Sequence, residues 1–399
     1  MPESTSCKED AQALLDCCLR AQPWPAALLD RLTQDDCSRE LFRVVIEGLA
    51  DRFDPALCEV YNALFIDVLR RAGLPALRPH DQPPPLPDSV ARVYVLSRVT
   101  LGADVAITSV LLDAVKHRFP RAGIFLAGSR KSWELFERDP RIAHLEIPYP
   151  RGGSLSERLT PWQALGEALV GEASALVVDS DSRITQLGLL PVCPNERYFF
   201  FPSRSYGGYD DESLGALVRR WAKEVFGVEA GAYIAPWRSG VPEGAPLVTV
   251  SIGVGENAAK RIGGPFEARL LGELAARGAT IYIDKGAGGE ETERVERAIA
   301  QSGAPAGSIH TWQGAFAPFA SAIAQSNLYV GYDSAGQHVA AACGVPLVSI
   351  FAGFPSQRMF ARWRPMGSGP IEVVRVDDPE PALVLEQTLA AVARLGIAV

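Results

Sequence analysis

The 399-residue sequence lacks the features that define several classes of protein. It has no apolar run that reaches the roughly 18 residues of a membrane-spanning helix. Its first residues, MPESTSCKEDAQ, are polar and of mixed charge, unlike a secretory signal. It has no surplus of basic residues: the formal net charge is -8, which argues against a nucleic-acid-binding surface. We therefore expect a cytoplasmic protein with no transmembrane segment and no nucleic-acid partner.

Metal-binding motifs are also missing. The seven cysteines include no CxxC pair, and neither Cys nor His recurs at the spacing of a zinc site. Five of the cysteines lie in the first 60 residues, and we expect all seven to be reduced thiols packed in helices. The sequence thus predicts neither a metal nor a cofactor.

The chain divides into three regions. Residues 1–74 carry apolar residues at three- and four-residue steps, as in SRELFRVVIEGLADRF, which is typical of packed helices. A proline-rich segment follows and predicts an extended linker over residues 75–90. We expect the first region to fold as a separate helical unit, with a role in forming a homo-oligomer or in docking the acceptor.

From residue 91 onward, short apolar strands alternate with helices, the pattern of a parallel, doubly wound sheet. The pattern blurs near residues 205–245 and then restarts. This predicts an α/β fold with two Rossmann-like domains facing a cleft, over 91–240 and 241–376, and a C-terminal helix over 377–399. Because open α/β sheets bind ligands at the carboxyl ends of their strands, polar residues directly after strands are the candidates for a site.

Two strand ends of the first domain carry acidic residues. After VYVL, the turn SRVTLGADVA contains Asp104, which is either the N-cap of the next helix or a functional carboxylate. Its small neighbours Gly102 and Ala103 leave room for a substrate hydroxyl. After ALVVD, four polar side chains are either an ordinary polar turn or contacts for a polyhydroxylated ligand: Asp179, Asp181, Ser182 and Arg183.

In the second domain, the strand VTVSIG is followed by the loop VGENAAKRIGGPF. The segment GVGENA fits the G-x-G-x-x-A fingerprint of a nicotinamide dinucleotide site, but GGP at 263–265 interrupts the helix that this fingerprint requires. Lys260 and Arg261 in the same loop suit a diphosphate better, with ordinary surface charge as the alternative. After TIYID, Glu290 and Glu291 open a helix, where carboxylates are favourable in any case and where either could accept hydrogen bonds from a ribose.

The stretch YDSAGQHVAAACGVPLVSIFAGF places polar and small residues between a strand and an alanine-rich helix. The free N–H groups and the positive dipole end of such a helix suit a phosphate, and small residues let it approach the backbone. An acidic residue is a poor neighbour for a phosphate but suits sugar hydroxyls. The turn consists of Asp333, Ser334, Ala335, Gly336, Gln337 and His338.

This stretch resembles the signature of the ADP-heptose lipopolysaccharide heptosyltransferases of glycosyltransferase family 9. That signature reads Asp-Ser-Gly-Pro-Met-His, then an alanine-rich helix, Gly-x-Pro, and an apolar strand before Phe-Gly. Here the spacing from Asp333 to His338 is the same, and LGADVAITSVLLDAVKHRFPRAGIFLAG is similar to the family's first turn, helix and strand. The resemblance runs from about residue 91 to the C-terminus, and the first region matches nothing in the core of the family.

The resemblance implies a GT-B fold and an inverting, metal-independent transfer from a nucleotide-diphosphate sugar, with ADP-heptose the expected donor. It places the acceptor on the first domain and the donor on the second. By position, Asp104 is the general base, Lys260 the cation on the leaving diphosphate and Glu290 the ribose ligand. Asp333 holds the donor sugar, and residues 334–338 seat the phosphates. The acceptor stays open: a glycan, a lipid or a protein.

The sequence departs from the family pattern at three points. One additional residue precedes Asp104, Ala-Gly-Gln replaces Gly-Pro-Met, and KRIGGPF replaces Lys-Arg-Trp-Pro. If the additional residue displaces Asp104, the base lies at Asp179 or Asp181. A nicotinamide-dependent oxidoreductase and a non-catalytic sugar-nucleotide-binding or scaffold protein are the alternative functions.

Overall fold

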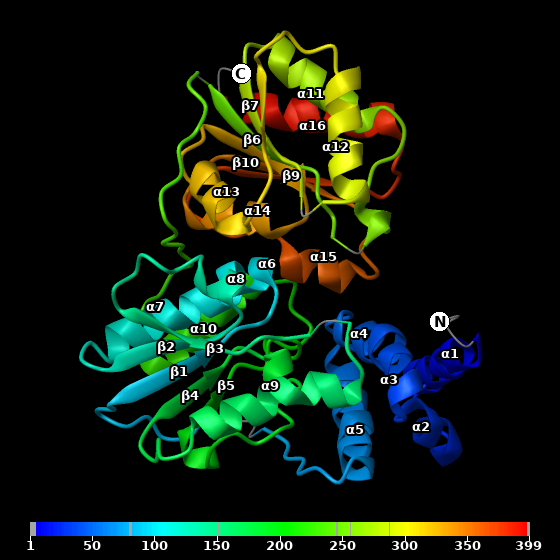
Figure 1. Ribbon diagram of the computed structural model, residues 1–399, viewed down its shortest axis with the longest axis vertical. Helices are drawn as coiled ribbons and strands as arrows, with labels where there is room; N and C mark the ends of the chain where they lie inside the picture. Colours follow the sequence, from blue (N-terminus) through cyan, green and yellow to red (C-terminus); the bar gives the residue numbers. More distant parts are fainter. Residues whose placement is uncertain are drawn as a thin grey trace.

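The computed structural model describes residues 5–79, 82–150, 152–244, 246–255, 257–286 and 288–396. Within these residues the chain forms two parallel sheets, each covered by helices, and a group of N-terminal helices beside the first sheet (Figure 1). The α/β class predicted from the alternating pattern is confirmed.

The N-terminal helices show how local sequence sets their ends. The longest, α5 (Pro55–Arg71), has proline at its first position, and Asp54 accepts a hydrogen bond from the Ala56 N–H. Gly73 follows the helix with φ +69, the left-handed conformation that often ends helices. The other elements are α1 (Thr5–Leu19), α2 (Ala26–Leu32), α3 (Asp35–Glu40), the π-helix η1 (Leu41–Ile46) and α4 (Glu47–Ala50).

The first sheet has the strand order β3-β2-β1-β4-β5. Helices cover both faces of a parallel sheet, so its central strand is buried from Val93 to Leu96. The strands are β1 (Arg92–Leu96), β2 (Gly123–Gly128), β3 (Ile142–Glu146), β4 (Leu176–Asp179) and β5 (Tyr198–Phe200). The helices are α6 (Leu101–Ala103), η2 (Asp104–Thr108), α7 (Ser109–Arg118), α8 (Arg130–Trp133), α9 (Leu155–Ala168), η3 (Arg183–Thr185), η4 (Asn195–Arg197) and α10 (Leu214–Phe226).

The second sheet has the order β11-β10-β9-β6-β7-β8. Its strands are β6 (Leu247–Ser251), β7 (Thr280–Asp284), β8 (Ile309–Trp312), β9 (Leu328–Tyr332), β10 (Leu347–Phe351) and β11 (Ile371–Arg375). The helices are η5 (Ala258–Lys260), α11 (Phe266–Ala276), α12 (Glu290–Gln301), α13 (Phe316–Ile323), α14 (Ala335–Ala342), α15 (Gln357–Trp363) and α16 (Pro381–Arg394).

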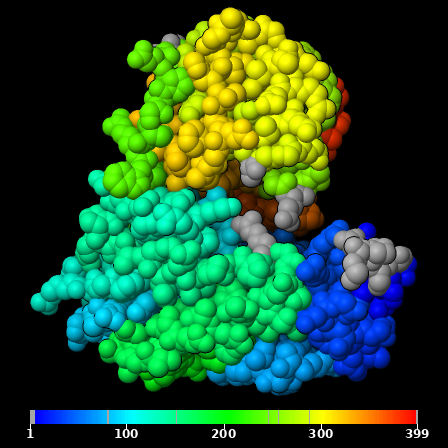
Figure 2. Space-filling view, viewed as in Figure 1, coloured from blue at the N-terminus to red at the C-terminus, as the bar shows by residue number. Residues whose placement is uncertain are grey.

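The helical region shares its core with the first α/β domain. Leu64 of α5 belongs to the same apolar cluster as Leu159 of α9 and Leu189. In the predicted linker, the Leu77 N–H donates a hydrogen bond to the Leu189 carbonyl (2.9 Å). Figure 2 shows the N-terminal helices in continuous contact with the green surface of this domain. The domain boundary at residues 75–90 stays a prediction, but the region before it lies packed against its neighbour.

The two α/β domains also pack on each other. Val105 of η2 and Val110 of α7 lie in one apolar cluster with Val339 and Ala340 of α14. α15 lies between the two domains, close to α4 (Figure 1). The domains thus meet through α6, η2 and α7 on one side and α14 and α15 on the other.

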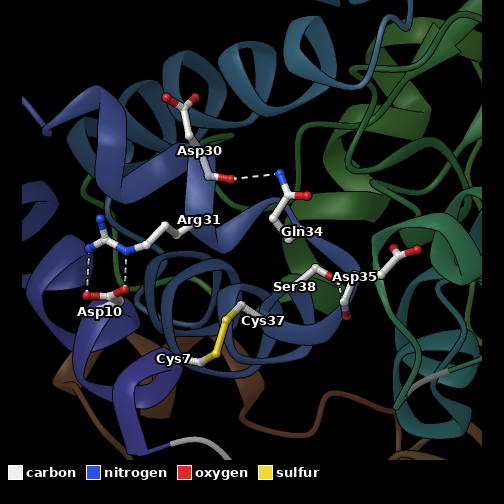
Figure 3. The surroundings of a disulfide bond; sticks show 8 residues. All are labelled: Cys7, Asp10, Asp30, Arg31, Gln34, Asp35, Cys37 and Ser38. Atoms are coloured by element: carbon white, nitrogen blue, oxygen red, sulfur yellow. Dashed lines mark hydrogen bonds and ion pairs between the residues drawn. A yellow bond between two sulfur atoms is a disulfide. The ribbon is translucent and has the colours of Figure 1, made fainter.

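Two sequence predictions are corrected by the structure. Cys7 of α1 and Cys37 of α3 form a disulfide (Figure 3), with their Cα atoms 5.3 Å apart, so not all cysteines are free thiols. Asp104 is not an N-cap, because α6 begins at Leu101 with Thr100 in the capping position. The local sequence contains no pattern that predicts the packing of α1 on α3. It also contains none that predicts the start of a helix before Asp104.

Candidate functional site

The strand order reverses between β1 and β4 in the first sheet and between β6 and β9 in the second. Such reversals open a crevice at the carboxyl ends of the strands, because the loops on either side diverge. Asp104 follows β1 and residues 179–183 end β4. Lys260 follows β6 and residues 333–338 follow β9. The structure thus brings the main predicted site residues to these two switch points.

Asp104 is fully buried rather than open to a substrate. Its carboxylate accepts hydrogen bonds from Ser97 Oγ (2.8 Å), the Arg98 backbone N–H (2.7 Å) and Thr108 Oγ1 (2.8 Å). Burial raises the pKa of Asp104, and these hydrogen bonds offset part of the rise. In this arrangement Asp104 holds the turn that follows β1.

The space expected beside Asp104 is filled by the second domain. A Cβ on Gly102 would lie 3.3 Å from Ala335 Cα and 3.3 Å from His338 Cδ2. The prediction that Gly102 and Ala103 leave room for a substrate hydroxyl is therefore wrong. The small residues instead let α6 pack against the first turn of α14.

Asp179 organises the turn after β4. Its carboxylate accepts hydrogen bonds from Thr185 Oγ1, Tyr198 Oη (2.5 Å) and the Ser182 N–H (2.7 Å). Burial raises the pKa of Asp179 to about 6. Ser182 is buried as well, and its hydroxyl donates to the Ser97 carbonyl (2.5 Å). Asp179 and Ser182 thus both stabilise the turn after β4 through their hydrogen bonds.

Asp181 is buried between two guanidinium groups. Arg204 donates to it from Nε (3.0 Å) and Nη2 (3.2 Å), and Arg98 Nη1 lies 3.1 Å from Oδ2. Burial alone would raise the pKa of Asp181, but the two guanidinium groups outweigh burial and hold that pKa below its usual range. Arg183 points elsewhere and pairs with Glu47 of the helical region, Nη2 to Oε2 2.6 Å. The DSDSR segment thus supports an ion-pair network.

On the donor side, Lys260 meets the turn before α14. Its Nζ lies 2.5 Å from Asp333 Oδ2 and 3.1 Å from the Asp333 carbonyl oxygen. Gln337 Nε2 donates to the other oxygen of Asp333 (2.5 Å), and Gln337 Oε1 accepts from Ser349 Oγ. The predicted phosphate cation and the predicted sugar-binding carboxylate are therefore direct neighbours.

The first turn of α14 has the features of an anion site. Ser334 precedes the helix, and its side chain accepts no capping hydrogen bond. The first N–H groups of α14 are therefore not used by a side-chain cap. A Cβ on Gly336 would lie 2.4 Å from Tyr329 Oη, so this position requires glycine. His338 is buried, and burial lowers its pKa to about 4, which keeps the imidazole neutral. Ala335 adds no side-chain bulk at this turn.

The remaining predicted residues lie at the edge of this site. Arg261 Nη1 contacts Glu290 Oε1 at 2.8 Å, and this hydrogen bond lowers the pKa of Glu290. Within the described residues, η5 begins at the last residue of GVGENA, a loop follows it, and α11 begins only at Phe266. The nicotinamide fingerprint thus lacks the helix that it needs.

A cavity of about 800 Å³ lies beside the first switch point. The helical region and the first α/β domain line it, and Asn257 and Trp363 of the second domain complete its wall. Its charged lining consists of Arg39, Glu40, Arg43, Glu47, Asp51, Arg98, Arg158, Asp181, Arg183 and Arg204. Of these residues, only Asp181 and Arg183 were predicted from the sequence as site residues. Of the other charged residues, only Arg98 lies in a loop just after a strand, so only its position could have suggested a site residue.

Two of these arginines present unpartnered nitrogen atoms. Nη1 of Arg183 and Nη1 of Arg204 are buried, and neither has a hydrogen-bond partner among the described residues. The Arg204 guanidinium also lies over the Tyr61 ring of α5, 4.6 Å from its centroid, which fixes its position. Buried donors without a partner are costly, so these two N–H groups favour an anionic group in the cavity.

The described part of the chain contains no group of three or more His, Cys, Asp and Glu side chains arranged to hold a metal ion. Its helices are all too short or too polar to cross a bilayer.

Solved structures share this fold. The glycosyl transferase family 9 protein from Veillonella parvula DSM 2008 aligns with a TM-score of 0.57 at 14% identity, over 78% of this chain and 98% of that one. E. coli heptosyltransferase WaaC with ADP-2-deoxy-2-fluoro heptose aligns at 0.51 and 16%, over 76% and 98%. E. coli ADP-heptose lps heptosyltransferase II aligns at 0.50 and 17%, over 76% and 99%.

No protein-family model and no curated protein matches the sequence. At these identities the likeness concerns the fold, and the GT-B fold predicted from the sequence resemblance agrees with it.

Proposed function

We propose that this protein is a glycosyltransferase. It transfers a sugar from a nucleotide-diphosphate sugar to an acceptor hydroxyl, with inversion and without a metal ion, and ADP-heptose is the expected donor. The observation that carries the proposal is that, at the β6/β9 switch point, Lys260 contacts Asp333 in the turn before α14, whose N-terminus has no side-chain cap. This arrangement occurs in a fold shared with family 9 glycosyltransferases.

The chemistry of transfer explains why these groups are needed. The acceptor oxygen attacks the anomeric carbon, and the diphosphate departs with the electrons of the broken C–O bond. The growing negative charge on the diphosphate is stabilised by a cation and by oriented N–H groups. Lys260 and residues 334–336 provide both. When Lys260 turns to the phosphate, it releases the Asp333 carboxylate, which is then available for sugar hydroxyls.

The acceptor occupies the 800 Å³ cavity beside the first switch point. Its arginine-rich wall favours an acceptor that carries a negative group, and the two unpartnered Nη1 atoms are the groups that would bind it.

Calorimetric titration with ADP-heptose and with a nicotinamide dinucleotide tests the proposal. ADP-heptose should bind and the dinucleotide should not. Lys260→Ala should weaken binding of ADP-heptose by about 1.5–3 kcal/mol, the usual contribution of a hydrogen bond to a charged group. Lys223→Ala is the matched control, because it removes an exposed lysine of α10 that pairs with Glu229 outside the site. Melting curves check that each variant is folded.

Equal affinity of the wild type and Lys260→Ala would place the diphosphate elsewhere. Preference for the dinucleotide would favour an oxidoreductase, and binding of ADP-heptose without turnover against any acceptor or water would favour a non-catalytic binding protein. Turnover that EDTA abolishes and Mg²⁺ restores would contradict the metal-free mechanism.

A further inference from the structure

The turn between α4 and α5 forms one wall of the cavity. Asp51 lies in this turn, exposed to the cavity that it lines. The same turn is held by α15 of the second domain: Arg358 Nε donates to the Phe53 carbonyl (2.7 Å), and the rings of Phe53 and Trp363 meet edge to face at 6.0 Å. The helical region thus places a carboxylate at a defined position between the two α/β domains.

Asp51 differs from the carboxylates predicted as the base. None of the described residues donates a hydrogen bond to its carboxylate. Asp104, Asp179 and Asp181 are fully buried, and their oxygens already accept several hydrogen bonds. A general base needs an accessible lone pair within hydrogen-bond reach of the proton that it takes. Of these four, only Asp51 lines the cavity with carboxylate oxygens that accept no hydrogen bond from the described residues.

The surroundings of Asp51 tune its protonation. Enclosure by the cavity walls raises the pKa of Asp51 to about 6, with a further rise from Glu47 of α4. Arg183 of η3, Arg98 after β1 and Lys260 of η5 act in the opposite direction without cancelling this rise. Further charged side chains face the same cavity: Arg39, Glu40, Arg43, Arg158, Asp181 and Arg204. At neutral pH the carboxylate is ionised and ready to accept a proton.

We infer that Asp51 is the general base of the transfer and that the N-terminal helical region is therefore part of the active site. The acceptor hydroxyl gives its proton to an Asp51 oxygen as its own oxygen bonds to the anomeric carbon, and the nucleoside diphosphate leaves. The proton then passes to water. A negative group of the acceptor, held by Arg183 and Arg204, directs the hydroxyl toward Asp51. This inference rests on the proposed function.

Donor hydrolysis, with water in place of the unidentified acceptor, tests the inference. ADP-heptose is the probe, and kcat is measured from pH 4.5 to 8.5. The wild-type kcat should fall tenfold per pH unit below about 6, because the base must be deprotonated. Asp51→Asn should lower kcat at pH 7.5 at least a hundredfold and remove this acid limb. Its affinity for ADP-heptose should equal that of the wild type.

Asp36→Asn is the matched control, because Asp36 is an exposed aspartate of the same helical region outside the cavity. Its kcat and pH profile should follow the wild type. Melting curves separate a catalytic role from a structural one. Asn at position 51 removes a charge that the folded state disfavours, so the melting temperature at pH 7.5 should stay the same or rise, whereas loss of a structural contact would lower it.

The inference is overturned if Asp51→Asn hydrolyses ADP-heptose at the wild-type rate, or if Asp104→Asn alone removes the acid limb while it remains folded. A wild type that binds no nucleotide-diphosphate sugar contradicts the proposed function and this inference with it. Normal donor binding with an unimpaired Asp51→Asn contradicts only the inference.

Discussion

At the scale of single residues, the acidic side chains at the ends of β1 and β4 are held by hydrogen bonds and ion pairs within the protein. The spacing that suggested a functional role for Asp104, Asp179 and Asp181 is equally compatible with hydrogen bonds inside the protein. Only the surrounding hydroxyl, amide and guanidinium donors distinguish the two roles, and those come from distant segments such as Tyr198 and Arg204.

Asp179 should make stability depend on pH. Its pKa of about 6 in the folded protein lies above the ordinary value of 3.8, so the folded state binds the proton more tightly than the unfolded state. Its contribution is fully present below pH 4 and is lost as pH rises through 6, a change of about 3 kcal/mol. Urea unfolding of the wild type and of Asp179→Asn from pH 4 to pH 7 measures the difference, which should change in this window. A constant difference would contradict the elevated pKa.

At the scale of elements, two helical glycines of the first domain face different surroundings. Gly102 in α6 lies against α14, whereas a Cβ on Gly166 in α9 would meet no atom within 4 Å. In the sequence Gly102 belongs to the predicted turn after VYVL, and nothing near either glycine shows which distant element it meets. Close approach of two elements far apart in the chain makes glycine necessary at one position and dispensable at the other.

Alanine substitutions at these two glycines should therefore change the free energy of unfolding in opposite directions. Gly102→Ala places a methyl group 3.3 Å from α14 and should lower the free energy of unfolding by about 1 kcal/mol or more, as overpacking does. Gly166→Ala should raise it by about 0.5–1 kcal/mol, because alanine loses less backbone entropy in a helix. Guanidinium unfolding of both variants measures the change. Stabilisation by Gly102→Ala would show that α6 does not pack tightly on α14.

At the scale of the whole molecule, the helical region is joined to the rest by a proline-rich segment and also by a shared core. The shared core extends to α9 and to the loop after η3. Arg358 of α15 also donates a hydrogen bond to the backbone carbonyl of Phe53, in the turn after α4. The region is therefore joined to the rest of the protein by packing as well as by its linker, and it contributes a wall of the cavity.

Limited proteolysis should cut first between residues 75 and 90, where the described residues include no helix or strand. The two fragments should then remain together in size-exclusion chromatography, because separating them would expose their common apolar core. Mass spectrometry of the first products locates the cut. Fragments that separate without denaturant would indicate an independent helical module, and early cleavage elsewhere would contradict the linker.

The type and order of the elements in this protein follow from its amino-acid sequence. Periodicity predicts the helices and strands, and the loop after each strand is located with them, so the position of Lys260 and of residues 333–338 after strands could be predicted from the chain alone. Which side chains are open to a ligand depends on the tertiary structure. Asp104 is enclosed because α14 packs over α6, and Asp51 faces a cavity because α4 docks beside arginines more than 40 residues away in the chain. Burial and charge at a site depend on such distant neighbours, which local sequence does not encode.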